Sequence, residues 1–277
     1  MLEIFTSKNS YWVCLCALLW FLTSCKDENV VITDDVKCRV ASFVQYDGSG
    51  NVSITSTYEH AENGQLLKRM SKLYDSNDPS KIASEQTVVF EYQTAQSPFL
   101  KKRSVFVADR LISYKTYTTD AKVTAYTRVQ DFDARGTQTR SVTYSGSSAT
   151  GLITATVSDA GRTPYRINMR YSPKRVLTEV SYDPQVLPTR TITRTEARRP
   201  IAYGFTLPPL DDDPNFGSAE NVAEYTTARP SGGIDAYLYE YTYDSNGFPT
   251  EVRAFLGTSG VGTPVLYART LLTYSCK

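Results

Sequence analysis

From about residue 38 to the end of the chain, apolar and polar residues alternate in short runs that are rich in Val, Ile, Thr and Tyr. An alternation of period two is typical of β-strands that bury one face and expose the other. The clearest runs are residues 142–144, 153–157, 167–171, 176–182 and 237–243. One stretch, residues 62–74, also spaces its apolar side chains like a helix, although a hairpin fits it equally well. The pattern predicts an all-β chain.

Short turn segments separate these runs. Each segment places an aromatic or polar residue before an acidic residue or a few turn-forming residues. The segments are residues 46–51, 58–64, 132–136, 158–161, 171–175, 182–184 and 243–247. Asp and Asn side chains bond to nearby backbone groups in turns, and Gly adopts positive φ without strain. Each segment therefore predicts a hairpin reversal, and the whole chain predicts an antiparallel meander of repeated hairpins.

These segments resemble degenerate YD repeats, the Tyr-Asp-x-x-Gly hairpin units of Rhs-type proteins, and the repeat-like β domains of many surface lipoproteins. The resemblance runs from about Tyr46 to Tyr243, with irregular spacing. It implies a curved or stacked open sheet in which each hairpin packs on the next. Full Rhs shells need far longer chains, so an enclosed cavity is not expected here.

The pattern also predicts the domain organisation. Residues 207–233 are acidic, contain several Pro and Gly residues and lack periodicity, which predicts a long surface loop. The residues that follow this loop are too few to build a core alone. Residues 38–277 are therefore expected to form a single β-rich domain.

The first residues of the chain have the layout of a signal peptide. Lys8 precedes an apolar run over residues 11–22, and the small residues Thr23 and Ser24 follow it. The run is shorter than the roughly 20 residues that a transmembrane helix needs. We therefore expect residues 1–24 to be removed.

The segment Leu22-Thr23-Ser24-Cys25 resembles the lipobox of bacterial lipoproteins. This resemblance implies that Cys25 is acylated and becomes the mature N-terminus, and that residues 25–37 form a flexible tether. The membrane contact is then the lipid alone, because several acyl chains anchor a soluble domain durably.

The residues after the cysteine, Lys26-Asp27-Glu28, resemble the signal that one group of Gram-negative bacteria uses to send lipoproteins to the outer face of the outer membrane. Any lipoprotein also needs a charged, solvated tether, which would explain the same residues. Display at the cell surface and an inward-facing position at the outer membrane both remain open.

Two cysteines remain in the mature domain, Cys38 and Cys276, near its two ends. The compartment implied by the leader is oxidising, which favours a disulfide bond between them. Such a bond would make the first and last strands neighbours. Free thiols remain the alternative, whereas two thiols without a nearby histidine or a CxxC spacing are a poor metal or redox site.

The composition narrows the possible function classes. The 277 residues include 30 Lys or Arg and 29 Asp or Glu, so the net charge of +1 gives no general attraction to polyanions, and no nucleic-acid partner is expected. The only histidine, His60, lies in a hairpin-like stretch. Gly48 and Gly50 begin a dinucleotide-binding fingerprint that is not completed, so no cofactor is expected.

No catalytic or metal-binding motif is complete. Asp211, Asp213 and Asn215 begin the spacing of a calcium loop, but the later positions do not continue it. Residues 257–259 begin a hydrolase elbow that Val261 does not complete. The sequence therefore predicts neither a metal site nor a nucleophilic serine.

Two groups of residues could still carry function. Glycoside cleavage needs two carboxylates at a suitable separation, and Asp131, Asp133, Glu179 and Asp183 are available. The second group is a row of tyrosines on one face of one predicted strand, which could stack on sugar rings or a partner, or could simply pack across strands. These tyrosines are Tyr237, Tyr239, Tyr241 and Tyr243.

Together these features predict a non-catalytic lipoprotein at the outer membrane, displayed at the cell surface, whose β domain serves as a binding or structural module for a glycan or an envelope protein. The alternative is a carbohydrate-active enzyme that uses paired carboxylates. A third possibility is a structural envelope component without a ligand.

Overall fold

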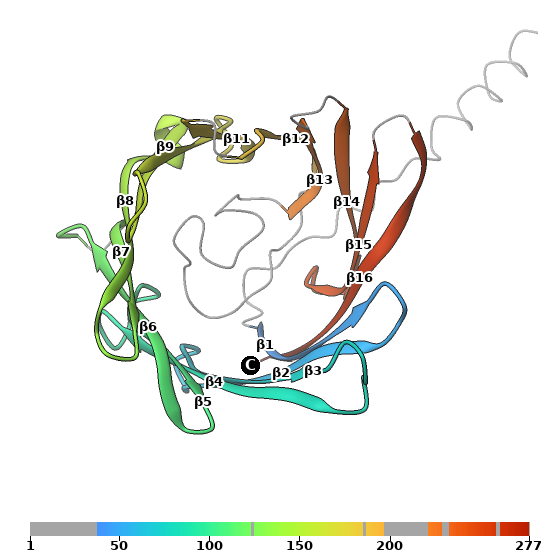
Figure 1. The fold of residues 1–277 in the computed structure, drawn as a ribbon, viewed down its shortest axis with the longest axis horizontal. Coiled ribbons are helices and arrows are strands. Elements are labelled where there is room, and N and C mark those ends of the chain that lie inside the picture. Colours follow the sequence, from blue (N-terminus) through green and yellow to red (C-terminus); the bar gives the residue numbers. More distant parts are fainter. Residues whose placement is uncertain are drawn as a thin grey trace, which may run out of the picture. The chain divides into compact units, whose positions relative to one another are not determined.

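The structure is a computed structural model that describes residues 38–122, 125–184, 187–196, 221–228, 233–258 and 261–276. In these residues it contains sixteen β-strands, and Figure 1 shows them arranged as a ring. The strands are β1 (Cys38–Asp47), β2 (Val52–His60), β3 (Leu66–Tyr74), β4 (Ile82–Tyr92), β5 (Leu100–Val107), β6 (Arg110–Thr119), β7 (Tyr126–Asp133), β8 (Gln138–Ser147), β9 (Leu152–Asp159), β10 (Tyr165–Tyr171), β11 (Leu177–Asp183), β12 (Arg190–Glu196), β13 (Asn221–Ala228), β14 (Ile234–Tyr243), β15 (Pro249–Thr258) and β16 (Val261–Cys276). A short 3-10 helix (Ser148–Thr150) joins β8 to β9.

The strands form one closed antiparallel barrel. Each strand pairs with its neighbours in sequence, and β1 also pairs with β16, from Cys38 opposite Cys276 to Asp47 opposite Ala268. The predicted all-β class and the meander order are right, but the predicted open sheet is wrong. Hairpin patterns are the same in an open sheet and in a barrel, because closure depends only on the pairing of the two end strands.

A disulfide bond lies at one end of the closing β1–β16 ladder. The Sγ atoms of Cys38 and Cys276 are 1.98 Å apart, and 238 positions separate the two residues in sequence. Cys38 is fully buried. The covalent link and the strand ladder therefore join the same two ends of the domain.

Two segments whose apolar and polar residues do not alternate clearly in the sequence are β-strands in the structure. Residues 66–74, which could have been helical, form β3 and pair with β2 and β4. The predicted loop over residues 207–233 is wrong for residues 221–228, which form β13, while residues 207–220 and 229–232 lie outside the described residues. Register shifts in the β12–β13 pairing break the alternation there, and this hides the strand from a pattern of period two.

Several predicted hairpin turns share one hydrogen-bond arrangement. In the turns that follow β1, β7 and β14, an Asp Oδ1 atom accepts hydrogen bonds from the backbone N–H groups two and four residues further on. The residue three positions after each Asp is a glycine with φ between 81° and 86°. The three Asp–Gly pairs are Asp47 and Gly50, Asp133 and Gly136, and Asp244 and Gly247. These hairpin reversals are therefore as the sequence predicted.

These bonds make turn stability depend on pH. The pKa of Asp133 is held below its usual value, first by the backbone N–H of Thr137. A carboxyl whose pKa is lowered in the folded state stabilises fully above its unfolded pKa, and the stabilisation is lost as the pH falls through the folded pKa. We therefore expect denaturation midpoints, measured from about pH 5 to about pH 2, to fall less in the Asp133→Asn variant than in the unsubstituted chain.

The matched control for this prediction is Asp109→Asn. Asp109 lies in the β5–β6 turn with φ of 60°, and its carboxylate accepts no hydrogen bond from the described residues. This variant should keep the full acid sensitivity of the unsubstituted chain. Equal acid sensitivity in the Asp133→Asn variant would contradict the assignment.

Candidate functional site

The inner wall of the barrel is mostly apolar. Fully buried side chains recur at every second position on neighbouring strands, for example Val157 on β9, Met169 on β10 and Val180 on β11. The pairing register places Met169 directly opposite Val180. On the convex side of a barrel, side chains point outward into the surroundings, so positions without solvent exposure belong to the inner face. These residues are part of the main apolar cluster.

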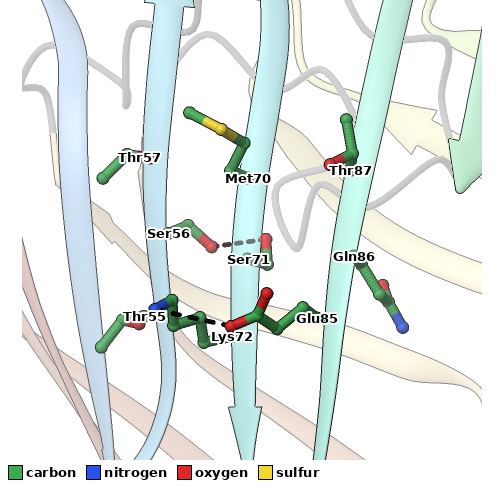
Figure 2. Close-up of a pocket in the computed structure, with 9 residues that line it drawn as sticks. All are labelled: Thr55, Ser56, Thr57, Met70, Ser71, Lys72, Glu85, Gln86 and Thr87. Carbon is green, nitrogen blue, oxygen red and sulfur yellow. Dashed lines mark hydrogen bonds and ion pairs between the residues drawn. The ribbon is translucent and has the colours of Figure 1, made fainter. Parts of the chain in front are cut away.

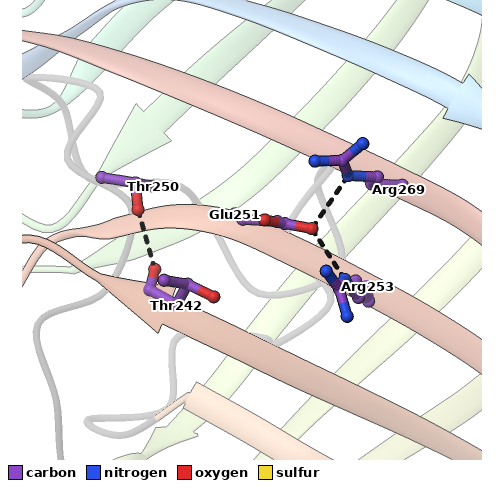
Figure 3. A network of polar contacts seen from close by, with 5 residues as sticks. All are labelled: Thr242, Thr250, Glu251, Arg253 and Arg269. Carbon is purple, nitrogen blue, oxygen red and sulfur yellow. Dashed lines mark hydrogen bonds and ion pairs between the residues drawn. The ribbon is translucent and has the colours of Figure 1, made fainter.

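The outer wall is polar and charged. Between the buried positions of β9 and β10 lie Thr156, Arg166 and Arg170, all of them exposed. Cross-strand ion pairs lie on the same face, such as Arg170 to Glu179 at 3.2 Å between Nε and Oε1. On β15 and β16, Glu251 accepts hydrogen bonds from two arginines, as Figure 3 shows. Their Nε atoms, in Arg253 and Arg269, lie 2.7 and 2.8 Å from Oε1.

This distribution differs from the pattern in a transmembrane barrel, which turns an apolar band toward lipid and a polar lining toward its lumen. Here charged side chains such as Arg170 and Arg253 lie outside, while the inner wall combines fully buried aliphatic side chains with ion pairs such as Lys115 to Asp131. The outer wall is therefore suited to water. Separately, the described part of the chain contains no helix long and apolar enough to cross a membrane.

The tyrosine row lies on the inner wall of β14 and packs across strands. Tyr237 stacks on Tyr225 of β13 with ring centroids 4.6 Å apart. The Tyr239 hydroxyl lies 3.3 Å from the Tyr267 hydroxyl, and burial raises the pKa of Tyr239. These contacts engage the rings and hydroxyls within the wall, as ordinary cross-strand packing does.

The two tyrosines nearest the end of β14 are also bonded within the wall. Tyr241 donates a hydrogen bond to the carbonyl oxygen of Val222 at 2.9 Å. Tyr243 donates to Oε2 of Glu196 at 2.8 Å and accepts a hydrogen bond from Asn221. Binding of a ligand by the row stays a prediction, and such a ligand would have to be recognised by the remaining exposed ring surface.

The four candidate carboxylates do not form one site. Asp131 and Asp133 lie on the inner face of β7, whereas Glu179 and Asp183 lie on the outer face of β11. Asp131 is 3.7 Å from the Lys115 Nζ atom. The lowered pKa of Asp133 keeps that group ionised, whereas a general acid in glycoside hydrolysis needs a raised pKa.

A cavity of about 350 Å³ lies at the rim of the barrel. Its wall comes from the start of β1, the end of β2, the β2–β3 turn and the end of β16. We call it the rim cavity, and its residues are Arg39, Ala41, Tyr58, His60, Ala61, Glu62, Asn63, Gly64 and Ser275. It lies beside the disulfide, because Arg39 and Ser275 are adjacent in sequence to Cys38 and Cys276 and opposite each other in the ladder.

Hydrogen bonds fix the turn that forms one wall of the rim cavity. The amide of Asn63 donates to the Ala95 carbonyl oxygen at 2.7 Å, and the amide of Gln65 donates to the Ser97 carbonyl oxygen at 2.8 Å. Gly64 has φ of 86° and donates its N–H to the carbonyl of Ala61. The wall is therefore held by the neighbouring β4–β5 loop.

A second hollow, the strand groove, is lined by residues of strands β2, β3 and β4 and has a volume of about 250 Å³. Figure 2 shows its residues in three cross-strand rows. The middle row contains Ser56 and Ser71, whose hydroxyls are 2.7 Å apart, and Lys72 and Glu85 form an ion pair below it at 3.5 Å. The remaining residues of the groove are Thr55, Thr57, Met70, Gln86 and Thr87.

Other predicted site residues lie outside the described part of the chain. These are the lipobox residues Leu22, Thr23, Ser24 and Cys25, the export signal Lys26, Asp27 and Glu28, and the calcium candidates Asp211, Asp213 and Asn215. Within the described residues, no group of three or more His, Cys, Asp or Glu side chains could hold a metal ion. Arg39 carries no recognisable signal in the sequence, because a single basic residue beside a cysteine forms no pattern.

Comparison with known protein families gave no match, and neither did comparison with curated proteins. Among solved structures, the chain is similar to a porin-like protein from Bacteroides uniformis, with 18% identity and a TM-score of 0.55, over 86% of this chain and 98% of that one. A porin-like protein from Bacteroides vulgatus aligns over 86% of this chain and 99% of its own, with 10% identity and a TM-score of 0.24.

The similarity to the Bacteroides uniformis structure shows a porin-like barrel fold. At this identity the similarity concerns the fold alone. The signal peptide, the lipid anchor and surface display stay predictions. Neither the structure nor the comparisons support the alternative, an enzyme of polysaccharide breakdown.

Proposed function

We propose that this chain is a non-catalytic envelope lipoprotein, held at the outer membrane by lipid on Cys25, with its barrel in water beside the bilayer. In this role the barrel binds a glycan or another envelope protein. The observation that supports the proposal is the outer wall, which carries charged side chains and ion pairs on several strands, while the fully buried aliphatic side chains lie on the inner wall.

Energetic reasoning supports a position outside the bilayer. A single Lys or Arg on the lipid face of a transmembrane barrel costs about 2–4 kcal/mol at the midplane. The outer wall carries several such residues on different strands, among them Lys72, Arg170 and Arg253. At the midplane their combined cost would be comparable to the stability of a typical domain, so attachment through acyl chains explains a membrane location better than insertion does.

The binding role is supported by the two hollows, the rim cavity and the strand groove. Both are lined by hydroxyl, amide and charged groups next to an aromatic or thioether side chain. Sugars offer both hydroxyls and apolar C–H faces, so a glycan fits these walls. A protein partner is the second candidate, because an exposed polar wall can also carry an interface.

Cell fractionation tests the proposal. The chain is expressed in a Gram-negative host in two forms, the natural one and one with residues 1–24 replaced by a cleavable secretory leader and with Cys25→Ser. We expect radiolabelled fatty acid to enter only the natural form, and this form to sediment with the outer membrane. We expect the Cys25→Ser form to be soluble without detergent, because its outer wall is polar.

A Cys25→Ser form that stays in the membrane and needs detergent for extraction would contradict the proposal, since a barrel inserted in the bilayer behaves in this way. Absence of fatty-acid label from the natural form would overturn the anchor. A transmembrane porin expressed in the same cells serves as the control for complete membrane recovery.

A further inference from the structure

We propose that the rim cavity binds a sugar that carries a carboxylate, and that the Arg39 guanidinium is its anchor. This inference rests on the proposed function as a glycan-binding module and assigns one site and one ligand class to it. A volume of about 350 Å³ lies at the lower end of the range for small-molecule pockets, which suits one or two sugar rings.

The positive charge of Arg39 is the main reason for expecting an anion. Its Nη1 atom donates to the carbonyl oxygen of Cys38 at 2.8 Å, and among the described residues no carboxylate forms an ion pair with it. Its Nε atom is buried without a hydrogen-bond partner, and the guanidinium lies against Gly64. A guanidinium presents five N–H donors in a planar fork, so it can bind a carboxylate through two parallel hydrogen bonds.

The other walls favour a sugar over a bare anion. Tyr58 offers an aromatic side chain, and aromatic rings pack on the C–H face of a pyranose. Ser275 and Glu62 are exposed at the same cavity and can bond to hydroxyl groups. The bonds from Asn63 and Gln65 to the β4–β5 loop hold the turn in place, so little ordering is needed on binding.

The single histidine of the chain, His60, allows ligand binding in the rim cavity to be measured directly. His60 lies in the rim cavity, so the imidazole resonance of a chain purified without a histidine tag reports on this site alone. The Cys25→Ser form, which keeps every described residue, is titrated with glucuronate, glucose and acetate at constant pH and ionic strength. We expect a saturable shift with glucuronate and much weaker binding of glucose and acetate.

Three variants test the residues. Arg39→Gln should weaken glucuronate binding about tenfold or more, because hydrogen bonds to a charged group are lost. Glu62→Gln should tighten it about two- to fivefold, because an exposed like charge is removed from the cavity. Arg170→Gln, on the outer wall and paired with Glu179, should leave binding unchanged. Circular dichroism verifies that each variant is folded.

Each other result overturns part of the inference. If glucose bound as tightly as glucuronate, recognition of the carboxylate would be disproved. If acetate bound as tightly, recognition of the sugar ring would be disproved. If no probe shifted the His60 resonance, the cavity would not be a binding site for this ligand class. Unchanged glucuronate binding in Arg39→Gln would disprove the role of Arg39 as the anchor. Tighter glucuronate binding in Glu62→Gln would independently support binding of an anion in the cavity. The fractionation result is unaffected by these outcomes, so failure of the ligand assignment is distinct from failure of the proposed function.

Discussion

Replacing both Cys38 and Cys276 by serine is expected to lower the free energy of unfolding by about 5 kcal/mol. The bond closes a loop in which the two residues are 238 positions apart, and a link across so long a loop removes much of the conformational entropy of the unfolded chain. The variant and the unsubstituted chain, both carrying Cys25→Ser, are compared by chemical denaturation without reductant.

A matched measurement keeps this prediction specific. Reductant should lower the stability of the unsubstituted chain toward that of the double variant and should leave the variant unchanged. Intact mass before and after alkylation shows whether the two thiols are bonded. Alkylation of both cysteines without reductant, or equal stability of the two chains, would contradict the disulfide's contribution.

Truncation of the inner wall should have the second large effect. Met169 is fully buried and packs in the apolar cluster, so Met169→Ala is expected to lower the free energy of unfolding by about 2–5 kcal/mol. The loss combines the transfer of the removed atoms to water with the cavity that they leave. Denaturant midpoints of the Cys25→Ser form, measured without detergent, would show it.

The control for Met169→Ala lies on the neighbouring strand and the opposite face. Thr156 is exposed on the outer wall of β9, so Thr156→Ala should change the stability by no more than about 0.5 kcal/mol. If the two substitutions had equal effects, or if Thr156→Ala were the more costly, the assignment of inner and outer faces would be wrong.

The local structure of this chain was predictable from local patterns. The alternating runs at residues 153–157, 167–171 and 237–243 lie within β9, β10 and β14. The turn after β7 was predictable as well, because Asp133 and Gly136 carry its hydrogen bonds and its positive φ. Each of these features depends on neighbours within a few residues in sequence.

Closure of the barrel was not predictable in this way. Pairing of β1 with β16 joins strands at opposite ends of the domain, and neither strand differs in pattern from a strand at an open edge. The possible Cys38–Cys276 bond already implied that these strands are neighbours, but an open meander of repeats was preferred by analogy with YD repeats. Strand β13 was missed because register shifts in its pairing with β12 interrupt the alternation.

For the candidate sites too, features set by nearby residues were predictable and features set by the long-range pairing of strands were not. The sequence placed four tyrosines on one face of a strand, which is right, but could not tell whether that face lies inside or outside the barrel. It offered Asp131 and Glu179 as possible partners, although the fold places them on opposite faces of the wall. The rim cavity depends on residues from both ends of the domain, so Arg39 gave no signal.

Closure also affects how copies of the protein can be packed together at high concentration. An exposed strand edge offers unpaired N–H and C=O groups to other chains and promotes aggregation. In the ring, β1 and β16 satisfy each other, so neither end strand can template the addition of a foreign strand. Many copies can therefore stand side by side without fusing into a continuous sheet.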